Sequence, residues 1–384
     1  MRLGNSYLKL KRFYTEEDII MVDKKVKLGI VGLKRGRSIA MDALDIPNMV
    51  LRAICDRDPD TLERARKTFA EEKNVEDLLC FSELDEMLQS DIDAVLIATD
   101  APLHAQHAIK AMNAGKHVLS EIPTIFSLEE AKALKETVKA HPELKYMAGE
   151  NCCYWAFIET WKKMHDKGMF GEIVYAEGEY LHSGDPEKFK PAEGEAKNHW
   201  RNHLPAIRYL THQMGPLLYI MDDKCVSVSC MEPAAKYNPN KQQPENGIAI
   251  FRTAKGAVIR VFICFGAYVG GGENNYKLYG TRGSIDTGVK NDYTHGYSYA
   301  KLADIPGTLF KKMEIPVGYK YIGEQASGHG GADGKMVRDF IRCIVEDTEP
   351  VLNVDFGIRM SLPGIIAHES ALQGGALLEI PEIE

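Results

Sequence analysis

Residues 26–36 read VKLGIVGLKRG, a short apolar run that stops at glycines and leads into a helix-like segment. Such a run is typical of a strand buried on both faces of a parallel sheet. Gly32 and Gly36 would let the backbone turn tightly and approach a pyrophosphate at the N-terminus of the next helix. The middle glycine of G-x-G-x-x-G is missing and the stretch is one residue short, so an ordinary strand–turn–helix corner fits the same residues.

A second apolar run, residues 49–56, reads MVLRAICD and ends in an acid. Asp56 follows Gly32 by 24 residues, near the place where a carboxylate binds the adenosine ribose 2′-hydroxyl in dinucleotide sites. A carboxylate there would repel a 2′-phosphate, so it favours NAD over NADP. Arg57 weakens that inference, and the turn that begins at Asp56 gives the acid a purely structural alternative.

Strands and helices alternate through the first 149 residues. We expect strands at 91–99, 116–120 and 145–148 and helices at 60–73, 102–115 and 127–139. The last helix opens with the capping-box pattern Ser127-Leu-Glu-Glu130. This alternation predicts an α/β domain over residues 25–149 with a doubly wound parallel sheet. Residues 1–24 lack an apolar core of signal-peptide length, and we interpret them as an N-terminal arm.

The pattern changes near residue 150. A helix is expected at about 154–165, and strands then follow closely at 173–180, 226–231, 247–252, 257–265 and 276–279. Residues 253–256 predict a hairpin turn between two of these strands. The pattern predicts a second domain over residues 150–384, with an open, mostly antiparallel sheet covered on one face by helices. A further helix at 332–346 and the segment to residue 384 would close that domain.

The composition limits the possible functions. With 384 residues, two domains are expected, and a net charge of -8 offers no basic stripe for nucleic acid. No run of 18 apolar residues occurs, so no membrane span is expected. The eight cysteines are scattered, several of them inside apolar runs, and they form neither a metal motif nor a disulfide ladder. We therefore expect no metal and a reducing, cytoplasmic location.

Short motifs follow one another along the chain: GIVG at 29–32, CDR at 55–57, ATD at 98–100 with His104, and AGKHVLSEIP at 114–123. In these motifs the chain resembles the Gfo/Idh/MocA oxidoreductases, which act on sugars and polyols. The resemblance implies an N-terminal Rossmann domain and a C-terminal α+β domain. Other motifs resemble glycoside hydrolase family 109, whose members use bound NAD to cleave glycosides. They read ENCCY at 150–154, GEYLH at 178–182, WR at 200–201, YLTH at 209–212 with GP at 215–216, and HGG at 329–331.

The resemblance implies NAD as the cofactor, a small-molecule carbohydrate as the substrate and, by analogy, a homo-oligomer. The residues that it places at the cofactor are Gly32, Lys34, Arg35, Gly36, Asp56, Arg57, Thr99, His104, Glu121, Ile122, Glu150 and Asn151. Those that it places at the substrate are Tyr154, His182, Trp200, Arg201 and His329.

Two positions depart from the family pattern. The family usually has Glu-Lys-Pro, whose lysine assists proton transfer, and Ile122 stands in place of that lysine. The Asp-x-x-x-His pattern of the sugar dehydrogenases is also missing, because Gln213 stands at the partner position when the chain is aligned on Tyr209. Hydrolases of family 109 also lack the lysine, so its absence fits them, but it fits an inactive protein equally well.

The resemblance implies glycoside cleavage through transient hydride transfer at C3, elimination and addition of water. Proton carriers are then required, and Tyr180 and His212 are the leading candidates for catalysis, with Tyr209 next. Each also has a structural interpretation: Tyr180 as a strand end bonded to backbone, and His212 as a packing residue at a helix N-terminus. A conventional sugar or inositol dehydrogenase and a non-catalytic sensor remain alternatives.

Overall fold

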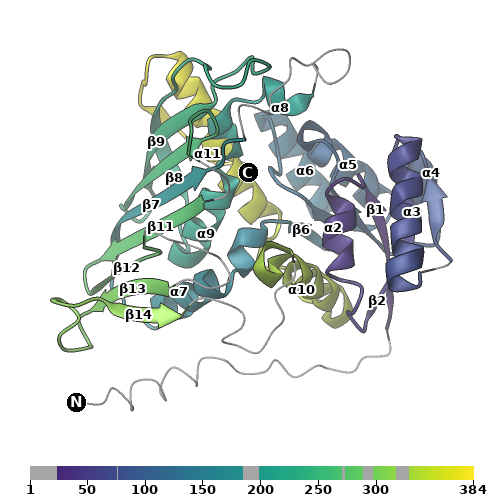
Figure 1. Cartoon of the computed structure of the whole chain (residues 1–384), viewed down its shortest axis with the longest axis horizontal. Coiled ribbons are helices and arrows are strands. Elements are labelled where there is room, and N and C mark those ends of the chain that lie inside the picture. Colours follow the sequence, from purple (N-terminus) through teal and green to yellow (C-terminus); the bar gives the residue numbers. More distant parts are fainter. Residues whose placement is uncertain (1–23, 76, 185–198, 270–272, 289–296, 317–327) are drawn as a thin grey trace.

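The computed structural model describes residues 24–75, 77–184, 199–269, 273–288, 297–316 and 328–384. The expected arm at residues 1–24 lies outside this part of the chain except for its last residue. Two sheets with their helices form two layered halves that face each other (Figure 1). The prediction of a parallel α/β half followed by a half with a mostly antiparallel sheet is confirmed.

The N-terminal half is a six-stranded sheet in the order β3-β2-β1-β4-β5-β6, in which every pair of neighbours runs parallel. This order is that of a doubly wound dinucleotide-binding sheet, with its crevice between β1 and β4. The strands are β1 Val26–Val31, β2 Met49–Cys55, β3 Leu79–Phe81, β4 Ala94–Ile97, β5 His117–Ser120 and β6 Tyr146–Ala148. The helices are α2 Gly36–Met41, α3 Pro59–Lys73, α4 Leu84–Leu88, α5 His104–Asn113 after the turn η2 Ala101–Leu103, and α6 Leu128–Ala140.

Local sequence explains where these helices begin. The side chain of Asp58 accepts the N–H of Asp60 and caps α3, while Ser127 accepts the N–H of Glu130 at 3.1 Å and caps α6. Both caps satisfy N–H groups that would otherwise lack a partner. The expected capping box is therefore present at its serine, although Glu130 reaches back to the N–H of Phe126 rather than to that of Ser127.

The C-terminal half is a nine-stranded sheet in the order β14-β13-β12-β11-β7-β10-β9-β8-β15. Only β7 and β10 pair in parallel among its described strands. Its strands are β7 Ile173–Leu181, β8 Cys225–Met231, β9 Asn246–Thr253, β10 Val258–Cys264, β11 Glu273–Gly280, β12 Gly283–Asp286, β13 Tyr297–Leu302, β14 Met313–Pro316 and β15 Leu378–Glu379. The expected hairpin at residues 253–256 joins β9 to β10.

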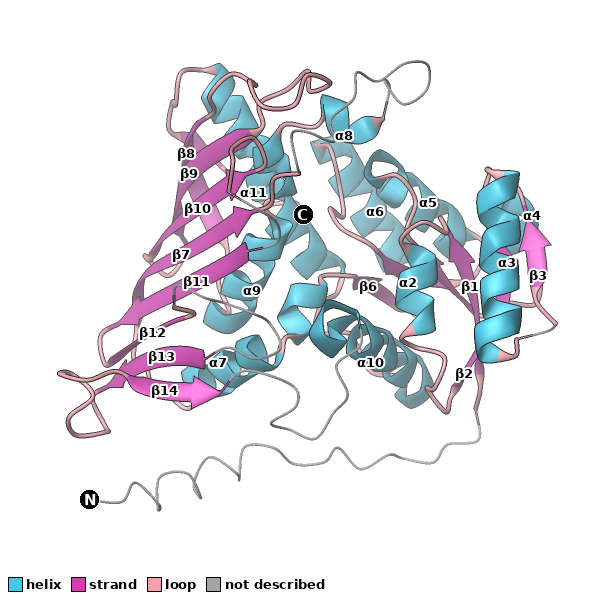
Figure 2. Ribbon diagram, in the orientation of Figure 1, coloured by secondary structure: helices cyan, strands magenta, loops and turns pink. Residues whose placement is uncertain are grey.

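Helices cover the face of this sheet that is turned toward the N-terminal half, and the opposite face is open (Figure 2). The helical segments are η3 Asn151–Tyr154, α7 Ala156–Asp166, α8 Trp200–His203, η6 Ala206–Tyr209, α9 Thr211–Met221, η8 Gly328–Gly331, α10 Ala332–Glu346 and α11 Val354–Leu372. Helix α10 has the predicted bounds and also contacts α2 of the first half. No described helix has the length and apolar content needed to cross a bilayer.

Candidate active site

The turn from β1 to α2 can pack closely against the segment that follows β4 only because it contains a glycine. Gly32 has a φ of 86°, and a Cβ there would lie 2.3 Å from the carbonyl oxygen of Ala98, at the end of β4. The carboxylate of Asp56 accepts the N–H of Leu33 at 2.8 Å and that of Asp58 at 3.0 Å. The turn is therefore fixed at the C-terminal edge of the sheet, where dinucleotides bind, and its shape fits NAD.

Arg35 turns from this loop toward the other half of the chain. Its guanidinium makes two hydrogen bonds of 2.8 Å to Asp333 in the first turn of α10 and lies 3.2 Å from Glu121. Asp333 is fully buried and also accepts from Asn151 and His329, each at 2.9 Å. Burial alone would raise the pKa of Asp333, but the hydrogen bonds from His329 and Arg35 outweigh it and hold that pKa well below its ordinary value. One carboxylate thus joins three of the expected site residues.

The other residues expected at the cofactor lie around the same edge of the sheet. Lys34 is exposed, and Arg57 pairs at 3.5 Å with Asp100. His104 is buried, with Nδ1 3.0 Å from the carbonyl of Pro123 and Nε2 3.1 Å from that of Thr99. The ring therefore ties the end of β4 to the segment after β5. Ile122 lies in that segment with 2% of its surface exposed.

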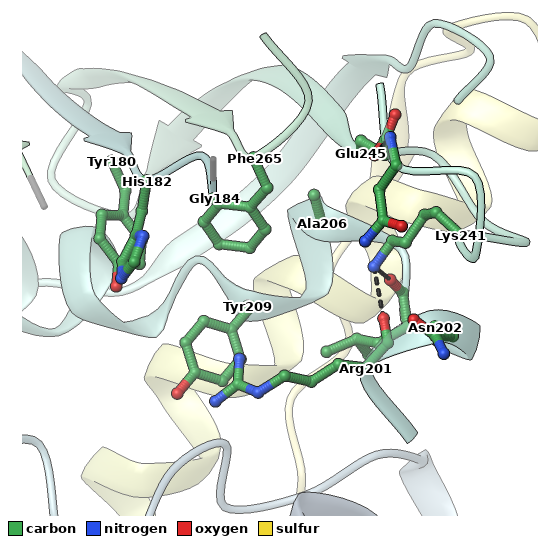
Figure 3. A pocket seen from close by; sticks show the side chains of 12 residues that line it. Tyr180, His182, Gly184, Arg201, Asn202, Ala206, Tyr209, Lys241, Glu245 and Phe265 are labelled. Carbon is green, nitrogen blue, oxygen red and sulfur yellow. Dashed lines mark hydrogen bonds between the residues drawn. The ribbon is translucent and has the colours of Figure 1, made fainter. Parts of the chain in front are cut away.

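A cavity of about 350 Å³ opens beside this edge, within the C-terminal half. Its lining residues come from the end of β7, from the segment around α8 and η6, from the loop before β9 and from the end of β10 (Figure 3). They are Tyr180, His182, Gly184, Arg201, Asn202, Leu204, Ala206, Tyr209, Asn238, Lys241, Glu245 and Phe265. The structure therefore brings together two of the three expected catalytic residues and two of those expected at the substrate.

His212 packs against Tyr180 and Tyr209, the two tyrosines that line the cavity. The centroid of its ring is 5.5 Å from that of Tyr180 and 5.5 Å from that of Tyr209, and both pairs pack edge to face. The backbone of His212 is held by Tyr276, which donates its hydroxyl to the His212 carbonyl at 2.5 Å. Tyr276 belongs to an aromatic core with Trp155 and Phe157, so the site stands on a packed support.

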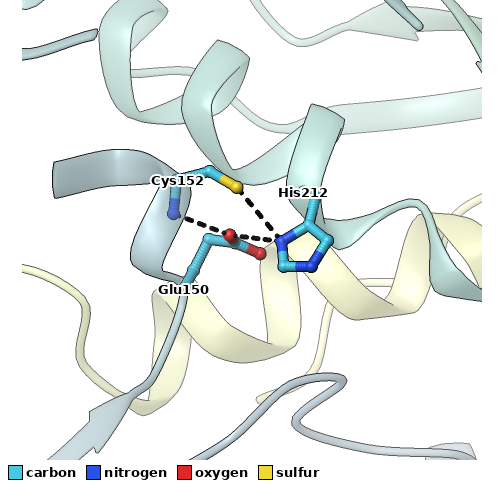
Figure 4. A group of neighbouring side chains, drawn as sticks. All are labelled: Glu150, Cys152 and His212. Atoms are coloured by element: carbon cyan, nitrogen blue, oxygen red, sulfur yellow. Dashed lines mark hydrogen bonds and ion pairs between the residues drawn. The ribbon is translucent and has the colours of Figure 1, made fainter. Parts of the chain in front are cut away.

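Glu150 orients the imidazole of His212 (Figure 4). His212 donates Nδ1–H to Glu150 Oε1 at 2.8 Å, and Nε2 has no partner among the described residues. Burial lowers the pKa of His212, but the charge and hydrogen bond of Glu150 outweigh it and raise that pKa above its ordinary value. The close packing depends on Gly215 of α9, because a Cβ there would lie 2.8 Å from Glu150 Cγ. Glu150 is fully buried, and its Oε2 has no hydrogen-bond partner in the part of the chain that the structure describes.

Cys152 joins this pair, with its Sγ 3.2 Å from His212 Nδ1. A glutamate, a cysteine and a histidine could in principle bind a metal ion. Here the donor atoms hydrogen-bond within the cluster, and burial together with the charge of Glu150 raises the pKa of the Cys152 thiol well above its ordinary value. We interpret the three residues as a hydrogen-bonded cluster that positions His212.

Some expected substrate residues lie away from the cavity. Tyr154 is buried and donates its hydroxyl to Asp339 at 2.8 Å. His329 does not line the cavity and pairs with Asp333 instead. Trp200 does not line it either, but its ring supports the guanidinium of Arg201 at 4.4 Å. Gln213, at the position where sugar dehydrogenases have histidine, is buried and donates to Asn274 at 2.6 Å.

Sequence reasoning missed Asp333 and Lys241 as members of the site. Neither lies in a motif that spacing alone would single out, and both act through partners distant in the chain. Asp333 follows the HGG motif by two residues, and this was the only signal that could have drawn attention to it. The contact of buried Cys152 with His212 likewise depends on how α9 packs and carries no local sequence signal.

Comparison with known proteins agrees with this architecture. Residues 26–149 match a family model described as the oxidoreductase family, NAD-binding Rossmann fold, and residues 158–286 match the GFO/IDH/MocA C-terminal domain. The sequence is 29% identical to glycosyl hydrolase family 109 protein 1 of Bacteroides fragilis (strain YCH46) over 83% of this chain and 76% of that protein. It is 25% identical to the glycosyl hydrolase family 109 protein of Solibacter usitatus (strain Ellin6076), over 93% and 88% respectively.

Among solved structures, levoglucosan dehydrogenase in complex with NADH superposes with a TM-score of 0.79 at 20% identity, over 94% of this chain and 100% of the other. At that identity the likeness concerns the fold. The expectation of an NAD-binding Rossmann domain and the family resemblance are confirmed. The chain belongs to the Gfo/Idh/MocA family of NAD-dependent oxidoreductases.

Proposed function

We propose that this protein acts on a carbohydrate and, more specifically, that it is a glycosidase that uses NAD without net oxidation of its substrate. The observation that carries the proposal is that Tyr180 and Tyr209 line one cavity of the C-terminal half and that both rings pack against the imidazole of His212. The names of the relatives, glycosyl hydrolase family 109, support the same reaction.

The residues that fit NAD are Gly32, whose missing Cβ lets the turn lie against the backbone at Ala98, and Asp56 after β2, which holds the same turn through the N–H of Leu33. Bound NAD supplies a hydride acceptor and donor. What remains for the protein is to move protons at the sugar hydroxyl and at the neighbouring carbon. Ile122 is buried and apolar and cannot do so, which leaves this task to the C-terminal half.

His212 suits the role of general base because Glu150 holds its Nδ1 and Nε2 is free to accept a proton. Tyr180 lies against the same ring and would serve as the second proton carrier. Tyr209 is less suited to lose its proton, because its burial raises its pKa, although Arg201 acts in the opposite direction. We assign Tyr209 to binding and to support of His212.

A conventional sugar dehydrogenase is the second candidate. It is favoured by the fold shared with levoglucosan dehydrogenase, and it would share the cavity and the nucleotide loop. The absence of a proton-carrying side chain at Ile122 argues against it. A non-catalytic sensor would also have the cavity, but it would not require a buried carboxylate behind His212.

The test uses purified protein with NAD and a panel of nitrophenyl glycosides. Release of nitrophenol without accumulation of NADH, together with exchange of a C2 deuterium into water, is the expected result. Accumulation of NADH with a keto product would favour the dehydrogenase instead. Retention of the deuterium throughout turnover would exclude elimination.

We also propose a homo-oligomer that uses the open face of the nine-stranded sheet. Large apolar side chains are exposed along β8 and β9, with Met231 at 59%, Ile248 at 40% and Ile250 at 54%. Exposed apolar patches of this kind mark interaction sites. Light scattering should show a multimer, and Ile250→Glu should lower its mass. We propose the cytoplasm as the location because all eight cysteines are free.

A further inference from the structure

The end of the cavity that lies away from Tyr180 is polar and carries positive charge. Lys241, Asn202 and Glu245 lie there, and the side chain of Arg201 extends from there toward Tyr209 (Figure 3). Glu245 is the one carboxylate among its described lining residues. Whether this end attracts an anion or a cation therefore depends on how each of the three charged groups is already engaged.

The carboxylate of Glu245 is engaged by backbone donors. Its Oε2 accepts the N–H groups of Lys236 at 2.9 Å and Tyr237 at 2.8 Å, and its Oε1 accepts that of Asn238 at 2.8 Å. Only 2% of the residue is exposed. Glu245 therefore folds the loop before β9 around itself, and both of its oxygens are engaged by backbone donors rather than by a ligand.

Arg201 has no carboxylate partner in the described part of the chain. Its guanidinium carbon lies 4.4 Å from the centroid of Trp200 and 5.2 Å from that of Tyr209. In Figure 3 the guanidinium reaches along the floor of the cavity toward the Tyr209 hydroxyl. Contact with two rings holds the guanidinium in place without neutralising its charge, so that charge remains available to an anion.

Lys241 is the second available cation. Its Nζ donates to the carbonyls of Arg201 at 2.5 Å and Leu204 at 2.7 Å, so one of its three N–H groups has no partner among the described residues. Burial lowers the pKa of Lys241 to about 8, with Glu245 opposing and Arg201 reinforcing this shift. The ammonium is thus mostly charged at neutral pH, in a place where water solvates it poorly.

We propose that this end of the cavity is a subsite for an anionic group of the substrate, a carboxylate or a phosphate. The apolar wall formed by Phe265, Leu204 and Ala206 would face the sugar ring, and the charged substituent would be directed toward Lys241 and Arg201. This inference rests on the proposed carbohydrate function and narrows it to charged glycosides. The anion belongs either to the sugar itself or to the leaving group.

Isothermal titration of the NAD-loaded protein with matched probes tests the subsite. One arm compares D-glucuronate with D-glucose and D-galacturonate with D-galactose. The other compares 4-carboxyphenyl with phenyl glucosides, and so distinguishes a charged sugar from a charged leaving group. In at least one pair the anion should bind about tenfold more tightly or better, and added salt should reduce that preference.

Two variants test whether Lys241 and Arg201 cause the preference for anionic over neutral probes. Lys241→Met should remove most of this preference while the affinity for the neutral probe changes about twofold or less, and Arg201→Gln should also remove most of the preference, measured as the ratio of the anionic to the neutral affinity. Lys255→Met is the matched control, because Lys255 also donates to two carbonyls, those of Met221 and Asp222, but lies outside the cavity. The control should keep the preference, and circular dichroism should show that all three variants fold.

If no anionic probe binds more tightly than its neutral counterpart, or if no probe binds at all, the proposed subsite is wrong. A preference for anions that survives both variants would also overturn it. Turnover of neutral nitrophenyl glycosides without NADH accumulation would leave the proposed function standing in either case. The two proposals therefore fail separately.

Discussion

Replacing Glu150 by glutamine should shift the pH dependence of catalysis to lower pH. Glu150 is fully buried, and its Oε1 lies 2.8 Å from His212 Nδ1. Glutamine preserves the shape of the side chain but removes the charge that favours the imidazolium form. The pKa of His212 should therefore fall, so that the neutral base is populated at lower pH.

The size of the effect follows from the burial of the pair. An opposite charge within ~4–6 Å shifts a pKa by ~1–3 units, which corresponds to about 1–4 kcal/mol. The pKa of His212 is raised on folding. The pair therefore contributes its full stability at pH values below about 6.5, which is the ordinary pKa of histidine. That contribution is lost as the pH rises through the raised pKa of the folded state. Glu150→Gln should therefore cost stability at acidic pH and little at alkaline pH.

The assay combines the pH profile of kcat/KM with urea unfolding at an acidic and an alkaline pH. The acid limb of the profile should shift to lower pH by ~1–3 pH units. Glu159→Gln is the matched control, because Glu159 pairs with Lys335 at 2.6 Å away from the cavity. An acid limb that stays in place in Glu150→Gln, with the protein folded, would refute the assignment of His212 as the base.

Three other changes test separate parts of the site. Asp333→Asn leaves Arg35 with Glu121 as its one carboxylate partner among the described residues, and it should lower the free energy of unfolding by ~3–5 kcal/mol. Titration with NAD should show about tenfold weaker binding. Unchanged affinity would show that the ion pair serves stability alone. Gly32→Ala places a methyl group against the Ala98 carbonyl at a positive φ, so thermal unfolding should show a loss of at least ~1–3 kcal/mol and NAD binding should disappear. Tyr180→Phe should lower kcat by about 10²–10⁴ while the Kd for NAD stays the same, and a loss confined to KM would make Tyr180 a binding residue only.

Much of the fold could be predicted because the sheet positions carry strong local signals. The buried runs that became β1, β2, β4 and β5 are apolar almost throughout, as strands buried on both faces must be. The short strands β12 to β15 were missed, since their sequences lack a clear period and they owe their pairing to neighbouring strands. Helix α11 was also missed: it is apolar on most sides and contains Pro363, so no amphipathic stripe marks it.

The site was predictable only where a motif covered it. Tyr180, Tyr209 and His212 were named from motifs, and the structure brings their rings together. Their assigned chemistry remains a prediction. The contacts of Asp333 with Arg35 depend on the packing of α10 against α2, which no local pattern encodes. Ion pairs across nearly 300 residues are decided by tertiary structure alone.

Under the proposed function, Ile122 makes the N-terminal half depend on the C-terminal half for its proton carriers. In the family pattern the N-terminal half supplies a lysine beside the cofactor, and here that position is apolar and buried. Under the proposed function, a proton that leaves the substrate would be accepted by the C-terminal half, where β7 and α9 place Tyr180 and His212 against each other. A base on that side needs a fixed tautomer, and the buried carboxylate of Glu150, at the junction of the two halves, provides it. We therefore expect the loss of the lysine and the Glu150–His212 pair to be two parts of one arrangement, in which Gly215 matters because a Cβ there would lie 2.8 Å from Glu150 Cγ.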